Sequence, residues 1–362
     1  MNESYEPLPQ QALDGLVVLD LSAGVAGQFA GRVLAEHGAQ VLLVEPPGGC
    51  TMRQATGMED RYLFRHLNSG KHSMVLDRTN PRGARAFERL VAGADVLLGE
   101  PPDEFAHWLE QDPRLITCVI RDFAPMGPYA NWKGSEMIHQ ALGGLMQATG
   151  VADREPLYGF GHRAYYSAGA AAVSAIVGAL LLVRRHGRGQ ALEIRVHETS
   201  ISMSQNIVTQ YAYNGTVQAR GPYPGACDIF RCSDGWASMY CRGDRWAALC
   251  ETLGEPGLPT DPRFGTIHDL IRHWPAAYAQ LAPRVRVLSV DEFVQRVQGA
   301  RGLASRVNSM GDVLKCDHMR ARDFWETDNQ GHTRLGPLFR MSLTPRHLFA
   351  TAPELDEEAT HD

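Results

Sequence analysis

Short apolar runs alternate with glycine-containing amphipathic stretches along the first part of the chain. One run at 16–19, rich in β-branched residues, ends in Asp20 and is followed by spaced glycines and a helical stretch to His37. A second apolar run at 41–44 closes with Glu45. Strand, glycine turn, helix and strand in this order are typical of a βαβ unit, whose strands lie parallel and are covered by helices.

The same alternation continues beyond this unit. Strands are predicted at 73–76, 96–98 and 115–120, and a helix at 81–92 begins with proline, a favoured first helical residue. Because strands that alternate with helices form parallel sheets, the first half of the chain is predicted to be α/β.

Segments rich in small residues follow. Helices are predicted at 137–149 and 168–185, the second ending at Gly187, and the segment 191–196 alternates like a strand. The stretch 164–183 contains no charged residue. Its Ala, Gly and Ser content predicts a buried helix rather than a membrane span, so no membrane partner is expected.

The texture of the sequence changes after about residue 222, where Pro, Cys and Trp become frequent. Short hairpin-like runs precede helical pieces at 245–253 and 290–298. These features predict a second, smaller α+β domain over about 225–325. The tail from Leu335 onward holds a short strand candidate and an acidic end that we expect at the surface.

The composition fits a globular protein of about two domains, at roughly 150 residues per domain. Of the 362 residues, 44% are hydrophobic and 21% charged, which excludes disordered and collagen-like chains. The 35 basic and 41 acidic residues give a net charge of −6, which argues against a nucleic-acid binder. The N-terminus is polar and the seven cysteines form no CxxC pair, so we expect a cytoplasmic protein without a zinc knuckle.

The common cofactor motifs do not fit. The first glycines follow the spacing G-x-x-G-x-x-x-G at Gly24, Gly27 and Gly31, whereas the dinucleotide fingerprint is G-x-G-x-x-G. Neither a Walker A, an HExxH, a GxSxG nor a kinase signature occurs. The histidines are dispersed without metal-ligand spacing, so no metal site and no tightly bound cofactor are predicted.

A string of collinear segments resembles one family over nearly the whole chain. The segments include LDGLVVLDLSAGVAGQFAGRVLAEHGAQVLLVEPPGG, LNSGKHSMVLD, DPRLITCVIRDFAPMGPYA, GSEMIHQALGGLMQATG and GRGQALEIRVHETSIS. They resemble the class III CoA-transferases, the group that includes formyl-CoA and carnitine CoA-transferases and the α-methylacyl-CoA racemases. The resemblance implies a Rossmann-like parallel-sheet large domain from 1–224 and 326–362, a small α+β domain at 225–325, and an interlocked dimer.

The resemblance also implies a nucleophile that this chain lacks. In the family, an aspartate four residues before a glycine attacks the acyl-CoA carbonyl to give a mixed anhydride and then an enzyme–CoA thioester. Here Tyr165 stands at that position. A phenol with a pKa near 10 is a poor nucleophile at neutral pH. Glu136, where the family often has Asp, is the remaining candidate acid, and Ser135 replaces the racemase histidine, so racemisation is not expected.

The family's CoA-binding positions are only partly kept. Three residues remain at family-like positions, namely Arg53, Asn68 and Lys71. Pro46 replaces an arginine that the resemblance places near the nucleotide end of CoA, and proline offers no phosphate contact. A neighbouring turn has become acidic, with Glu100, Asp103 and Glu104. We therefore expect the chain by itself to bind CoA or acyl-CoA weakly.

Three hypotheses follow. The first is a non-catalytic subunit of a heteromeric transferase that moves CoA between carboxylic acids, with an Asp-bearing homologue as partner and a CoA thioester as substrate of the complex. It resembles the Asp-lacking subunit of (R)-benzylsuccinate CoA-transferase. The second is a repurposed acyl-CoA lyase, isomerase or hydrolase that uses Tyr165 and Tyr166 with His162 or Arg163. The third is a homodimeric transferase that uses Glu136.

Overall fold

The chain divides into two units, each described by itself. The computed structural model describes residues 11–54, 57–99, 105–218, 220, 226–328, 331–346 and 351–356. Unit 1 comprises 1–149, 156–218 and 321–362, and unit 2 comprises 150–155 and 219–320. The peptide therefore leaves unit 1 and returns to it, and unit 2 also takes the short segment 150–155.

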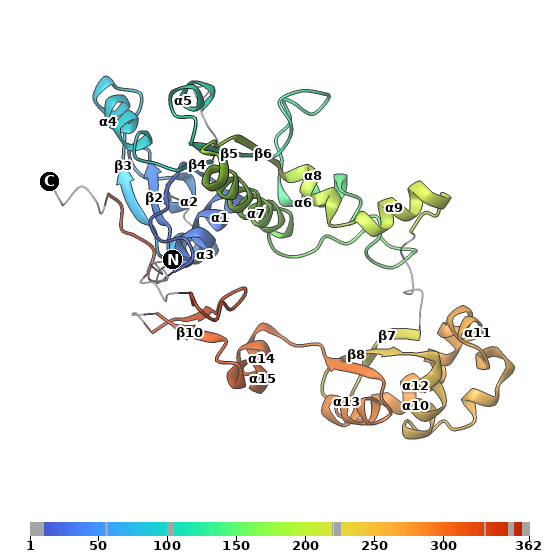
Figure 1. The fold of residues 1–362 in the computed structure, drawn as a ribbon. Helices are drawn as coiled ribbons and strands as arrows, with labels where there is room; N and C mark the ends of the chain where they lie inside the picture. Colours follow the sequence, from blue (N-terminus) through green and yellow to red (C-terminus); the bar gives the residue numbers. More distant parts are fainter. Residues whose placement is uncertain are drawn as a thin grey trace, which may run out of the picture. The chain divides into compact units, whose positions relative to one another are not determined.

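Unit 1 is built on a six-stranded parallel sheet with the strand order β3-β2-β1-β4-β5-β6 (Figure 1). The strands are β1 (Val17–Asp20), β2 (Gln40–Glu45), β3 (His72–Val75), β4 (Val96–Gly99), β5 (Ile116–Arg121) and β6 (Ala191–Arg195). This confirms the predicted parallel α/β sheet. The order reverses direction between β1 and β4, and ligands of such sheets bind beyond the carboxyl ends of the strands at that point.

Helices cover both faces of this sheet (Figure 1). They are α1 (Val25–Glu36) and α7 (Arg163–His186) on one face, and α4 (Pro81–Val91) and α5 (Phe105–Gln111) on the other. Because side chains alternate along a strand, Val18 packs with the α1 and α7 side, while its neighbour Leu19 packs with Phe87 of α4. A sheet that is covered on both faces explains the nearly continuous apolar strand sequences.

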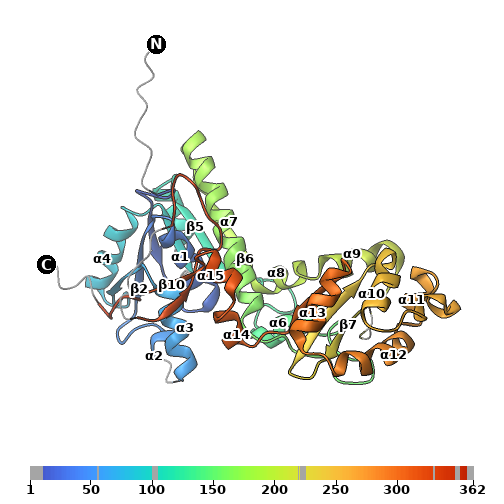
Figure 2. The same ribbon diagram turned by 90° about the horizontal axis from the view of Figure 1, so that it is seen from below.

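Helix α7 runs alongside α1, and its buried face carries mostly small residues (Figure 2). Its length and composition alone would allow a membrane span, yet 28% of its most apolar window is buried within the chain. The predicted buried helix is thus buried on one face only, since Val177 and Leu181 are exposed. The helix ends where predicted, with Gly187 in the left-handed conformation at φ 66°.

The remaining elements of unit 1 are short. They are α2 (Thr51–Gln54), α3 (Met58–Asn68), α6 (Glu136–Leu142), α8 (Val196–Ser202), α9 (Gln205–Asn214), β10 (Trp325–Thr327) and β11 (Thr333–Leu335). The helix predicted at 137–149 was too long, because α6 stops at Gly143 and the following Gly144 has a φ of 81°.

Unit 2 is an antiparallel sheet with the strand order β7-β8-β9, packed against helices. Its elements are β7 (Ala226–Arg231), β8 (Trp236–Cys241), η1 (Gly243–Arg245), α10 (Trp246–Thr252), η2 (Leu258–Thr260), η3 (Pro262–Phe264), α11 (Ile267–Arg272), α12 (Trp274–Arg286), α13 (Val290–Gly299) and β9 (Leu303–Arg306). The helices α14 (Met310–Leu314) and α15 (Asp317–Ala321) follow. The predicted helical pieces are confirmed as α10 and α13. Among the described residues of unit 2, the largest fully buried side chains are Phe230, Phe264, Trp274 and Phe293.

Candidate active site

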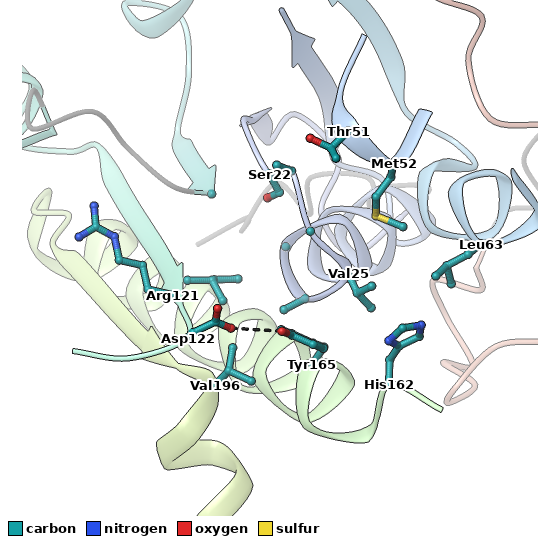
Figure 3. A pocket seen from close by; sticks show the side chains of 16 residues that line it. Ser22, Val25, Thr51, Met52, Leu63, Arg121, Asp122, His162, Tyr165 and Val196 are labelled. Atoms are coloured by element: carbon teal, nitrogen blue, oxygen red, sulfur yellow. Dashed lines mark hydrogen bonds between the residues drawn. The ribbon is translucent and has the colours of Figure 1, made fainter. Parts of the chain in front are cut away.

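A cavity of about 490 Å³ lies in unit 1 where β1, β4 and β5 end and α1 and α7 begin (Figure 3). The lining residues are Ser22, Ala23, Gly24, Val25, Ala26, Gly27, Thr51, Met52, Leu63, Gly99, Ile120, Arg121, Asp122, His162, Tyr165 and Val196. Its place at the reversal of strand order is where open α/β sheets bind ligands. A mostly apolar wall with a few converging polar groups is typical of a small-molecule site.

Tyr165 lines this cavity from the first turn of α7. Its hydroxyl donates a hydrogen bond to Asp122 Oδ1 at 3.2 Å, drawn as the dashed line in Figure 3. Burial raises the pKa of Tyr165, and the charge and hydrogen bond of Asp122 raise it further. The phenol therefore stays protonated at neutral pH, so it acts as a hydrogen-bond donor rather than as a nucleophile.

Asp122 is the carboxylate of the cavity wall, and it was not among the site residues expected from the sequence. It follows β5 directly, and its side chain is 33% exposed. His139 Nε2 donates to its Oδ1 at 2.8 Å, and the Gly134 amide donates to its Oδ2 at 3.0 Å. Burial raises the pKa of Asp122, but the hydrogen bonds outweigh this effect and hold the pKa below its ordinary value. The group is ionised at neutral pH.

Glu136, the candidate acid of the sequence analysis, lies elsewhere. It is buried, and its Oε1 accepts from the Ala164 amide at 2.9 Å and from Gln140 Nε2 at 2.7 Å. Its Oε2 accepts from the Tyr165 amide at 3.4 Å. These contacts satisfy amides that have no partner within the first turn of α7. Glu136 thus anchors the helix start, and it does not line the cavity.

Of the other residues in the repurposed-enzyme hypothesis, His162 lies at the cavity and Tyr166 does not. His162 lines the cavity, with its ring centroid 6.4 Å from that of Tyr165. Tyr166 packs edge-on against Phe29 at 4.9 Å between ring centroids. The hydroxyl of Tyr165 is bonded to a carboxylate, whereas the hypothesis expected a neighbouring arginine at Arg163.

Arg53 is engaged within unit 1 and does not line the cavity. Its guanidinium binds Glu45 through Nη2 at 2.6 Å and through Nε at 2.9 Å, and Nη1 donates to the Pro353 carbonyl at 3.0 Å. Burial raises the pKa of Glu45, but Arg53 and further hydrogen bonds bring it below its ordinary value. The arginine therefore meets a carboxylate in place of a phosphate.

Lys71 and Asn68 are buried together. Lys71 Nζ donates to Asp20 Oδ2 at 2.6 Å, to the Gln28 carbonyl at 2.8 Å and to Asn68 Oδ1 at 3.0 Å. Neither side chain of the Lys71–Asp20 pair is exposed. A Cβ at Gly31 of α1 would stand 2.5 Å from Asp20 Oδ2, which explains one of the spaced glycines. A CoA contact at Lys71 would require this pair to open.

A second cavity of about 750 Å³ lies beside the first strands of the sheet. Its wall includes Glu45, Pro46 and Pro47, and the guanidinium of Arg78 lies 4.7 Å from the ring centre of Phe87.

Two further expectations from the sequence concern an acidic turn and metal ligands. The acidic turn, with Glu100, Asp103 and Glu104, lies outside the described residues. Within the described part of the chain, no group of three His, Cys, Asp or Glu side chains is placed to hold a metal ion.

Comparisons with known proteins cover almost the whole chain. The family model described as CoA-transferase family III matches residues 13–359. The succinyl-CoA–D-citramalate CoA-transferase of Chloroflexus aurantiacus is 31% identical, over 96% of this chain and 92% of its own length. The succinyl-CoA–L-malate CoA-transferase beta subunit of the same organism is 27% identical, over 95% and 91%.

Solved structures also match this chain over almost its whole length. A CAIB/BAIF family protein from Brucella suis superposes with a TM-score of 0.89 at 28% identity, and the match covers 97% of this chain and 98% of that one. Rv3272 from Mycobacterium tuberculosis, at 24% identity, has a TM-score of 0.85 and shares the fold.

Proposed function

This chain belongs to CoA-transferase family III, and on that premise we propose that it moves CoA from an acyl-CoA thioester to a small carboxylic acid. The observation that carries the proposal is the position of the cavity. An apolar space of acyl size opens at the N-terminus of α7, the place where the family resemblance puts the acyl-accepting residue. The acyl group would occupy this cavity during transfer.

The test is CoA exchange by the purified chain alone. Acetyl-, butyryl- and succinyl-CoA are each incubated with a panel of carboxylic acids that includes benzylsuccinate, and new thioesters are identified by mass spectrometry. We expect at least one new acyl-CoA to form with this chain as the only protein. The absence of any exchange would contradict a self-sufficient transferase.

A second candidate role is the nucleophile-lacking subunit of a heteromer. Two observations favour it: Tyr165 occupies the position of the family aspartate with a protonated hydroxyl, and one relative is named as a beta subunit. The partner would then be an Asp-bearing homologue, interlocked with this chain. Co-expression with such a homologue from the same source should yield a co-purifying complex, and exchange should occur in the complex but not in this chain alone.

A further inference from the structure

The cavity at the start of α7 retains a carboxylate, on a different element from the one that the family resemblance indicates. We propose that Asp122 is the acyl acceptor of this chain, the residue that carries first the acyl group and then CoA. The inference rests on the proposed CoA transfer and goes beyond it by assigning the reacting atom. Asp122 comes from the loop after β5, whereas Tyr165 comes from α7.

The two side chains meet in the same space. Tyr165 and Asp122 both line the cavity and point toward one another in Figure 3, with 3.2 Å between the hydroxyl and Oδ1. Position 165 of α7 and the Asp122 carboxylate at the end of β5 therefore open onto one cavity. In this chain the carboxylate that lines the cavity stands at the end of β5, on Asp122, and the residue at the start of α7 is the uncharged Tyr165.

The hydrogen bonds of Asp122 suit a nucleophile that is held in place. His139, which has no exposed side-chain surface, donates a hydrogen bond to Oδ1, and the Gly134 amide donates one to Oδ2. Because a carboxylate can only accept, Nε2 of His139 is the donor atom. Among the described residues Oδ2 has a single partner, the Gly134 amide, so it keeps a lone pair, and a third of the side chain is exposed. These contacts keep the group ionised, and the same acidity makes it a good leaving group once it is acylated.

The transfer balances without any further reactant. Asp122 Oδ2 attacks the thioester carbonyl, the new C–O bond forms and the C–S bond breaks, so that CoA leaves as the thiolate and a mixed anhydride remains. The thiolate attacks the Asp122 carbonyl carbon of the anhydride and expels the first acid as its carboxylate, which leaves an aspartyl–CoA thioester. The acceptor carboxylate repeats the two steps in reverse, and no net proton is consumed.

The surroundings protect such an intermediate. Val25, Met52 and Leu63 give the cavity an apolar wall, and a mixed anhydride lasts longer where water is excluded. The first turn of α1 also lines the cavity, and the N–H groups of a first turn have no partner within the helix. Such groups favour the negative oxygen of a tetrahedral intermediate.

The rival carboxylate is less suited to attack. Glu136 is buried, both of its oxygens accept hydrogen bonds, and it lies outside the cavity wall. Its replacement should loosen the start of α7 rather than remove a reacting atom.

Trapping of the enzyme–CoA thioester tests the assignment. The purified full chain is incubated with butyryl-CoA, or with whichever thioester of the panel exchanges, and is then reduced with borohydride, which converts an aspartyl thioester into homoserine. Peptide mass mapping locates the product. We expect homoserine at position 122 in the wild type and in Tyr165→Phe, and none in Asp122→Asn.

Exchange rates of the same variants provide the second readout. Asp122→Asn should lower exchange by on the order of a thousandfold or more, as expected when a nucleophile is lost. Tyr165→Phe should lower it by about tenfold or less, the worth of one hydrogen bond. The exposed Asp153→Asn serves as the matched carboxylate control and should exchange at the wild-type rate. Circular dichroism checks that each variant is folded, and Asp122→Glu, which keeps a carboxylate, should retain part of the activity.

Failure of the Asp122 assignment and failure of the proposed CoA transfer give different results. Homoserine at another carboxylate, or exchange that persists in Asp122→Asn, overturns Asp122 as the acceptor and leaves the proposed transfer intact. Absence of both exchange and adduct in the wild type overturns the proposed self-sufficient transfer and the assignment with it. Activity that then appears only with an Asp-bearing homologue supports the second candidate role.

Discussion

The uncharged Tyr165 hydroxyl lies 3.2 Å from the Asp122 carboxylate, whereas an aspartate at position 165, although shorter, would add a second negative charge to the same cavity. Like charges in close contact raise the pKa of one partner, as in paired acids in general. The tyrosine at position 165 is thus compatible with an ionised Asp122, and an aspartate there would compete with it. The two positions are alternative places for a single charge.

We therefore expect Tyr165→Asp to disturb exchange although it adds the residue that the family resemblance calls for. Neighbouring carboxylates raise the pKa of one member of the pair, so the exchange rate of this variant should rise with pH over the range in which that group loses its proton. In Asp122→Asn/Tyr165→Asp the competition is gone, and exchange should exceed that of Asp122→Asn by at least about tenfold. Initial rates across a pH series measure both effects. A double variant no faster than Asp122→Asn would show that a carboxylate at position 165 cannot replace the one at position 122.

His66 gives unit 1 a pH-dependent stability. Burial lowers the pKa of His66 to about 3, aided by the charge of Arg32, whose Nη1 lies 2.6 Å from His66 Nε2. The folded pKa lies below the unfolded value of about 6.5, so the unfolded state takes up the proton first and stability falls as the pH drops below that value. Between pH 7 and pH 5 the loss should be on the order of 1–2 kcal/mol.

Urea unfolding at several pH values measures this slope. His66→Gln should flatten the decline between pH 7 and pH 5, because the titrating group is gone. His318→Gln, at an exposed histidine, should leave the slope unchanged. Equal slopes in the wild type and His66→Gln would rule out His66 as the cause.

The site shows how far single residues can be interpreted from sequence. The resemblance located Tyr165 correctly at the start of a helix, because the small-residue pattern of α7 is local and strong. Asp122 carried no local signal, since its partners Gly134, His139 and Tyr165 are brought to it by the fold. The one available clue was its place directly after a predicted parallel strand, where ligand-binding residues gather.

At the scale of elements, α1 and α7 are in close contact at Gly169. A Cβ at this position would stand 2.5 Å from the Ala26 carbonyl oxygen, which is backbone and cannot yield without moving α1. Gly178, on the same helix, has open space around it. The two glycines of α7 therefore have different surroundings, which the sequence alone does not reveal.

This difference predicts opposite effects of the same substitution. Gly169→Ala should lower the free energy of unfolding by about 1–3 kcal/mol, the usual cost of overpacking. Gly178→Ala should raise it by about 0.5–1 kcal/mol, because alanine favours the helix. Denaturant unfolding of both variants measures the pair, and a stabilised Gly169→Ala would mean that α1 and α7 are not in close contact there.

Element boundaries were predictable where a cap or a stop is local. Helix α4 begins at Pro81 after Asn80, whose side chain accepts from the amides of Arg82 and Gly83, and the sequence placed this start correctly. Helix α6 was predicted too long because the small residues that suggested it continue past Gly143, where the chain turns. Composition indicates which residues can be helical, whereas glycine stops and tertiary contacts decide where the helix ends.

At the scale of the whole molecule, charge works against an anionic ligand. The chain carries a net charge of −6, and both Arg53 and Lys71 are paired with carboxylates. CoA carries several phosphate charges, and the loss of one arginine contact costs roughly 1.5–3 kcal/mol. Free CoA should therefore bind the isolated chain more weakly than micromolar, which titration calorimetry measures.

Freeing Arg53 from its ion pair with Glu45 should raise the affinity of the chain for CoA. Glu45→Gln removes one charge from the wall of the second cavity and frees the guanidinium that Glu45 holds. CoA affinity should then rise several-fold at low salt and less at high salt, where charges are screened. Lys71→Met should lower stability without improving affinity, because Lys71 is buried. A micromolar wild-type dissociation constant would contradict the electrostatic argument.

Unit 1 is made of three separate segments of the chain, and this arrangement has a consequence during synthesis on the ribosome. The last segment brings Arg346 into ion pairs with Glu36 and Glu326, contacts that no nascent chain can form before residue 346 has emerged. All six strands of the sheet and all residues of unit 2 emerge earlier, so the sheet can form before its last segment is available. The side chains of unit 1 that this last segment covers, Glu36 among them, are therefore exposed to solvent until the segment has been made.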